Sequence, residues 1–223
     1  MSGSGVYELP AKRSQGSVVL VTSVGDAAAV REPAAALACA GSEPDRAGLL
    51  IDLSEARRPR PTPIASAGAR ALEERIAAHL PEAAVASRGT ICRLTAPPVG
   101  DAGETLDPVA AALPLARDSL AVVHLPPALL QPTLADPRIR PTAALLRADL
   151  PADRALTALA AHDLIARGLR VKVLKRQLNW LAGRFATLGA LPSSEYKKLQ
   201  HWYGGKDGSE NGRRKTHADG DHP

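Results

Sequence analysis

The sequence is poor in aromatic residues, in cysteine and in long apolar runs. Aromatic residues make up 3% of its 223 residues, so a core must be built mainly from alanine, leucine, valine and isoleucine. The two cysteines, Cys39 and Cys92, form no CxxC motif and no Cys/His spacing that would hold zinc, so we expect buried, reduced thiols. No stretch reaches the length of a membrane span, and residues 1–16 lack the apolar run of a signal peptide. We therefore expect a cytoplasmic protein.

The composition that remains is that of a globular protein with a modest excess of positive charge. Apolar residues make up 45% of the chain, and the formal net charge is +5. Much of this excess lies in residues 57–60 and 167–184. A modest basic excess is more typical of a solvated surface than of a nucleic-acid interface, so nucleic acid is the less favoured partner.

Short apolar runs alternate with helical patterns along most of the chain. The runs predict strands over residues 17–22, 48–53, 90–94, 119–125, 142–147 and 169–174. Helical spacing of apolar residues predicts helices over residues 30–40, 65–80, 106–116, 151–167 and 177–188. This alternation predicts an α/β fold, a parallel sheet with helices on both faces in a Rossmann-like three-layer arrangement. We expect a loose arm over residues 1–16, one domain over 17–190 and a polar, disordered tail over 191–223.

In such sheets ligands bind at the carboxyl ends of the strands, so the loops after these strands are the first place to look for a site. The first of these regions reads VTSVGDAAAVREPAAALA from residue 21 to residue 38, and the second reads GLLIDLSEARRPRPT from residue 48. Later segments read SLAVVHLPPAL from residue 119 and TAALLRADLPADRALTALAAHDLIARGLRVKVLKR from residue 142. Together they resemble the MinD/ParA-type partition ATPases and their relatives in Tad/Flp pilus assembly. The resemblance implies a P-loop NTPase fold.

The phosphate-binding loop of that family does not survive in this sequence. By the resemblance, the phosphate-binding lysine falls at Val30, the hydroxyl that follows it at Arg31, and the family's signature lysine at Gly25. Alanines and Asp26 replace the loop glycines. Alanine disfavours the backbone conformations that glycine permits, and a carboxylate at Asp26 repels phosphate.

The acidic positions of the family are only half retained. The Walker B aspartate falls at His124, and a neutral imidazole is a poor substitute for the hard oxygen ligands that magnesium prefers. Asp52 matches an aspartate that the family uses near the nucleotide. These positions predict a pseudo-ATPase with no catalytic residue, no cofactor and no metal ligand. Gly25, Asp26, Val30, Arg31, Asp52 and His124 are then vestigial nucleotide-site positions.

Asp52 and His124 have structural interpretations as well. Asp52 is expected to cap a loop or to pair with an arginine of residues 57–60. His124, at the end of a buried strand, is expected to be a hydrogen-bonded structural residue. The alternative is an unorthodox nucleotide-binding enzyme that uses Asp52, Arg31 and His124.

The C-terminal part carries a second kind of signal. Residues 177–188 place Leu178, Leu181, Phe185 and Leu188 on one helical face, with basic residues off it. Such a helix either closes the core of the domain or serves as an interface, with residues 176–188 on an anionic membrane surface or a partner. Aromatic residues gather further on, in the tail. We expect partner contacts at Leu181, Phe185, Trp202 and Tyr203.

Two functional hypotheses follow besides the unorthodox enzyme. The first is a non-catalytic MinD/ParA-like scaffold or regulator in bacterial pilus or secretion assembly or in partitioning. Its partner would be a protein, such as an active ATPase of the same family. The second is a basic adaptor that binds membrane, DNA or protein through its C-terminal helix and tail. If it binds membrane, we expect it at the inner face.

Overall fold

The computed structural model describes residues 17–25, 30–54, 64–96, 99–148 and 152–175. The strands are β1 (Val18–Ser23), β2 (Gly48–Asp52), β3 (Ala84–Arg88), β4 (Ile91–Thr95), β5 (Ala121–His124), β6 (Ala143–Ala148) and β7 (Arg170–Lys175). The α-helices are α1 (Arg31–Ala40), α2 (Ala67–His79), α3 (Ala102–Ala112), α4 (Leu130–Ala135) and α5 (Asp153–Ala166). Two 3₁₀ turns complete the elements, η2 (Leu113–Ala116) and η3 (Pro127–Leu129).

The strands form one sheet in the order β3-β4-β2-β5-β1-β6-β7. Every neighbouring pair is parallel except β3 and β4, which form an antiparallel hairpin at one edge. The central strands β1, β2 and β5 are buried along their whole length, as expected for Val/Leu/Ile runs covered on both faces. The predicted α/β fold with a parallel sheet is therefore confirmed.

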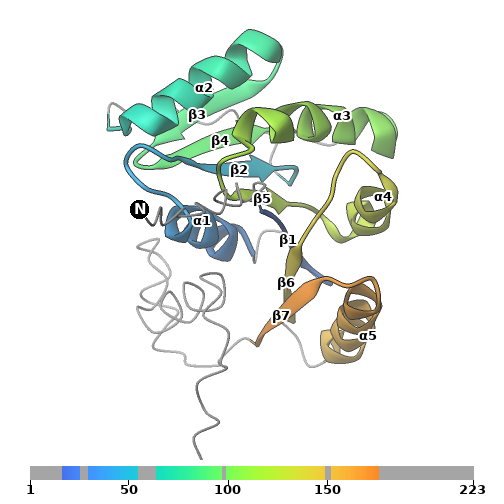
Figure 1. Ribbon diagram of the computed structural model, residues 1–223. Coiled ribbons are helices and arrows are strands. Elements are labelled where there is room, and N and C mark those ends of the chain that lie inside the picture. The colour runs from blue at the N-terminus through green and yellow to red at the C-terminus, as the bar shows by residue number, and fades with distance from the viewer. Residues whose placement is uncertain (1–16, 26–29, 55–63, 97–98, 149–151, 176–223) are drawn as a thin grey trace, which may run out of the picture.

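Helices cover both faces of the sheet (Figure 1), but unequally among the described residues. On one face α1 packs its buried Ala34 and Leu37 against Val19 and Val21 of β1. The other face carries the larger apolar cluster, to which α2, α3, α4 and α5 contribute buried residues. The carboxyl ends of β1, β2, β5 and β6 meet at one edge of the sheet because these strands run in the same direction.

Three local features differ from the sequence expectations. Strand β3 was not predicted, because AVASR has little of the β-branched, apolar character that marks a strand. Helix α3 starts earlier than predicted, since the Asp101 side chain accepts a hydrogen bond from the Glu104 backbone N–H and caps the helix. The proline-rich stretch after β5 contains η3 and α4, whose prolines lie near the starts of these elements.

One burial expectation was wrong, that for Cys39, and the structure shows which face of α5 packs. Cys92 is buried, but Cys39 is exposed at the end of α1. Leu156 and Leu159 of α5 face solvent, whereas Leu164 is fully buried. Helix α5 is rich in apolar residues around its whole circumference, so spacing alone does not identify the face that packs.

Several predictions fall outside the described residues: the arm over 1–16, the helix over 177–188 and the tail over 191–223. None of the described helices is long and apolar enough to cross a membrane.

Candidate functional site

The carboxyl edge of the sheet brings Asp52 and His124 together. They end the neighbouring parallel strands β2 and β5 and are partners in the register of these strands. His124 Nδ1 lies 3.1 Å from Asp52 Oδ1, and both side chains are completely buried. The sequence placed both residues at strand ends, and the structure makes them a direct pair.

Asp52 has further partners on both carboxylate oxygens. Oδ1 accepts hydrogen bonds from the backbone N–H of Ser54 at 3.0 Å and from its hydroxyl at 2.7 Å. Oδ2 accepts a hydrogen bond from Arg93 Nη2 at 2.6 Å. Arg31, the first residue of α1, places Nε 3.9 Å from Oδ2. The pairing of Asp52 with an arginine was expected, but Arg93 on β4 was not among the candidates, and residues 57–60 lie outside the described part.

These contacts decide the charge state of Asp52. Burial on its own raises the pKa of the carboxyl, because it penalises the charged form. Hydrogen bonds from His124 and Ser54, together with the charge of His124, outweigh burial and hold the pKa well below its ordinary value. The Arg93 guanidinium acts in the same direction. Asp52 is therefore a buried carboxylate that is ionised and fully bonded.

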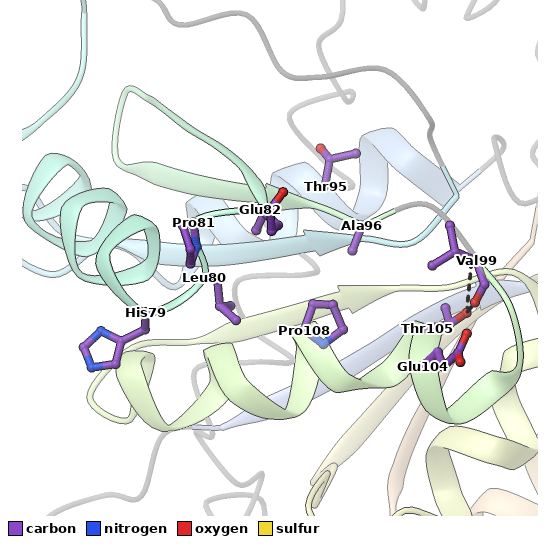
Figure 2. Close-up of a pocket in the computed structure, with 11 residues that line it drawn as sticks. His79, Leu80, Pro81, Glu82, Thr95, Ala96, Val99, Glu104, Thr105 and Pro108 are labelled. Atoms are coloured by element: carbon purple, nitrogen blue, oxygen red, sulfur yellow. Dashed lines mark hydrogen bonds between the residues drawn. The ribbon is translucent and has the colours of Figure 1, made fainter.

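Thr95 lies beside this cluster, but its hydroxyl is not part of the hydrogen-bond network around Asp52. It is the register partner of Asp52 on β4, so the two side chains share a face of the sheet. Figure 2 shows Thr95 and Ala96 pointing to opposite sides of their strand. The Thr95 hydroxyl is buried and makes no hydrogen bond to any residue that the structure describes.

We expect the isosteric substitution Thr95→Val to raise the free energy of unfolding by about 1 kcal/mol, because it removes a buried hydroxyl that has no hydrogen-bond partner among the described residues. Urea unfolding of the two proteins measures this. A loss of stability of similar size would show that the hydroxyl has a partner in the native state in solution. Ser87→Ala is the control, since the Ser87 hydroxyl donates to the Ala69 carbonyl at 2.8 Å and its removal is expected to destabilise.

The remaining vestigial positions are distributed around the start of α1. Val30, at the position of the phosphate-binding lysine, is completely buried in the apolar cluster between α1 and the sheet. Gly25 lies at the end of β1 next to Asp153 of α5, whose carboxylate Oδ2 would be 3.1 Å from a Cβ at that position. Asp26 lies outside the described residues.

The expected partner-binding residues Leu181, Phe185, Trp202 and Tyr203 also lie outside the described part of the chain. Among the residues that are described, no group of three or more His, Cys, Asp or Glu side chains is placed to hold a metal ion.

The cluster does not fit a magnesium nucleotide bound as the resemblance implies. The carboxylate oxygens of Asp52 already accept five hydrogen bonds or ion pairs from side chains and backbone of the same chain. Val30 offers no charge, and His124 is turned to Asp52. Nor does it form a hydrolytic triad, because Ser54 Oγ approaches His124 through Nδ1, the same nitrogen that faces Asp52.

Ser54, Arg93 and Thr95 were missed at the sequence level. Arg93 is a charged residue inside the strand predicted over residues 90–94, which is itself a signal that it has a partner. Ser54 follows Asp52 by two residues, the spacing at which an aspartate accepts hydrogen bonds from the backbone ahead of it.

No protein-family model matches the sequence, and no curated protein matches it. Among solved structures, the chain is similar to the MinC:MinD cell division protein complex from Aquifex aeolicus, with a TM-score of 0.45 and 16% sequence identity. The similarity covers 83% of this chain and 78% of that chain. At this level we infer neither family nor function from the match, and the α/β fold rests on the sheet itself.

Proposed function

We propose that the chain is a non-catalytic MinD/ParA-like domain that acts as a scaffold or regulator through a protein partner. We place its action in the cytoplasm, at or near the inner face of the membrane, in bacterial pilus or secretion assembly or in partitioning. The resemblance of residues 21–176 implies this setting.

The observation that carries the proposal is the burial of Val30. At the position where the resemblance requires a lysine that reaches phosphate, an apolar side chain with 0% exposure packs into the core beneath α1. A lysine at this position would have to leave the core to meet a ligand. The state of Asp52 supports the same proposal, because a carboxylate saturated by His124, Ser54 and Arg93 is a structural element.

The test is whether the protein responds to nucleotide. We expect no hydrolysis of ATP or GTP above background and no change in the melting temperature with 1 mM Mg-ATP. A nucleotide present at about a hundred times its Kd would add about 2.7 kcal/mol, or about 5–10 °C for a domain of this size. A shift of that size, or turnover that is abolished in Asp52→Ala, would overturn the proposal.

A second candidate is favoured by one specific observation. Asp52, Arg31 and His124, the three residues of the hypothetical unorthodox enzyme, meet at one edge of the sheet. This candidate predicts that Mg-ATP or another nucleotide stabilises the protein and that Arg31→Ala removes the effect. The control is Arg117→Ala, because the Arg117 side chain is 82% exposed and paired only loosely with its neighbour Asp118 at 3.9 Å.

A further inference from the structure

A cavity lies on the face of the sheet away from Asp52. It encloses about 300 Å³ between the end of α2, the turn into β3, the end of β4 and the first turns of α3. Asp52 follows Leu50 by two residues and so lies on the same face of the sheet, the face beneath α1, whereas the cavity is bordered by Leu80 and Ala96 of the opposite cluster. Of the candidate-site residues, Thr95 also borders the cavity, whereas Asp52, His124, Ser54, Arg93 and Arg31 do not. A volume near 300 Å³ is at the lower end of the range for small-molecule pockets.

The walls of the cavity are mainly apolar. Figure 2 shows the lining residues, which come from the end of α2 and the turn after it, from the end of β4, and from the start of α3. The apolar lining residues are Leu80, Pro81, Ala83, Ala96, Val99 and Pro108. Prolines and alanines have little side-chain freedom, so a ligand would lose little affinity to the ordering of these walls.

The wall formed by the start of α3 is held by its own hydrogen bonds. The Thr105 hydroxyl oxygen accepts a hydrogen bond from the Val99 backbone N–H at 3.2 Å. The same hydroxyl lies 2.9 Å from the backbone carbonyl oxygens of Val99 and Asp101, to either of which it can donate. Gly100 has a φ of +61°, and a Cβ there would collide with the Glu104 carboxylate, so Glu104 folds directly over this glycine. The carboxylate is thus positioned beside the cavity before any ligand arrives.

The charge at the cavity is opposite to that of the chain. The protein carries a formal net charge of +5. The charged residues among the described ones that line this cavity are Glu82 and Glu104, both exposed, and neither lysine nor arginine accompanies them. His79 also belongs to the lining, but in Figure 2 its ring points away from the other labelled residues. An apolar cavity with two carboxylates at its rim is complementary to an apolar body that bears a positive charge.

We propose that this cavity binds a small organic amine, with its apolar body between Leu80 and Pro108 and its ammonium group toward Glu82 and Glu104. This assignment rests on the apolar walls of the cavity and on the two carboxylates at its rim. It does not depend on the function proposed above. The walls would contribute to affinity by burying apolar area of the ligand, and the carboxylates at the rim would favour a positively charged ligand over a negatively charged one.

The first test compares two probes with the same phenyl body and opposite charge, 2-phenylethylammonium and 3-phenylpropanoate, by calorimetric or NMR titration at low salt. We expect the ammonium probe to bind about tenfold more tightly than 3-phenylpropanoate, because the carboxylates attract the ammonium group and repel the carboxylate of the second probe. The double variant Glu82→Gln/Glu104→Gln should bring the ratio of the two affinities close to one. Glu74→Gln, an exposed glutamate of α2 that does not line the cavity, should leave the ratio unchanged.

The second test locates the body of the probe. Ala83→Phe fills part of the cavity and should weaken binding of the ammonium probe at least about fivefold, whereas Ala78→Phe, at an exposed position of α2 outside the cavity, should not. If Ala83→Phe fails to fold, intermolecular NOEs from the phenyl protons to the methyl groups of Leu80 and Val99 in the wild type locate the probe instead. Equal affinity for both probes, a preference that survives the double glutamine variant, or binding without these NOEs would overturn the proposal.

Discussion

Asp52→Asn is expected to lower the free energy of unfolding by about 2–4 kcal/mol, measured by urea unfolding at neutral pH. The asparagine keeps the size of the side chain but removes the negative charge that His124 and Arg93 face. His124 is completely buried and cannot turn to water, whereas the Arg93 side chain is 27% exposed and regains part of its hydration. The expected loss is therefore smaller than that for a fully buried pair.

The matched control for this substitution is Asp118→Asn. Asp118 is 79% exposed, and the nearest atom of its arginine partner is 3.9 Å away, so the expected change is below about 0.5 kcal/mol. An Asp52→Asn protein as stable as the wild type would contradict the structural role that we assign to Asp52. Residues kept for binding or catalysis often cost stability, so an increase would favour the unorthodox site instead.

The pH dependence of stability gives an independent check on the same group. The folded-state pKa of Asp52 is lowered from an ordinary value of 3.8, so its contribution is fully present above that value and is lost as the pH falls below it. The difference in stability between wild type and Asp52→Asn should therefore be constant at pH 5 and above, apart from any titration of histidines, and should shrink in more acidic solution.

The meeting of Asp52 and His124 could be predicted in part from the sequence. Each ends a buried apolar run, and parallel strands present their carboxyl ends at one edge, so proximity follows once the strands are neighbours. The order of the strands does not follow from periodicity, because it is set by packing between distant segments. Arg93 was missed for that reason: its position next to Asp52 depends on β4 lying beside β2.

The strands of the central sheet were predicted well because each is a short apolar run bounded by turns. The buried face of α5 could not be predicted from the sequence. Leu156 and Leu159 fit a helical repeat as well as Leu164 does, and the choice of packing face depends on the position of the β6–β7 edge beneath the helix. The helical repeat can be seen in the sequence, but the position of strands β6 and β7 relative to the helix cannot. The C-terminal helix over residues 177–188 rests on the same kind of periodicity and stays a prediction.

The second large effect is expected at Gly48, the first residue of β2. A Cβ at this position would collide with the backbone carbonyl of Ala38 in α1, and its backbone N–H donates to the Thr90 carbonyl at 3.0 Å. The neighbouring atoms belong to main chains, so they cannot move aside as a flexible side chain would. The last turns of α1 can approach the sheet this closely because Gly48 has no side chain.

Gly48→Ala is therefore expected to lower the free energy of unfolding by about 2–3 kcal/mol. Replacing glycine restricts the unfolded chain and on its own would stabilise the protein by about 0.4–1 kcal/mol, so the clash must exceed this gain for the net effect to be a loss. The control is Gly103→Ala in the first turn of α3, where a Cβ would meet only the Asp101 side chain at 3.1 Å. There alanine should leave stability unchanged or raise it by up to about 1 kcal/mol, because alanine favours a helix over glycine. Urea unfolding of both variants decides the matter: if Gly48→Ala were no less stable than Gly103→Ala, α1 would not lie against β2 as closely as the structure places it.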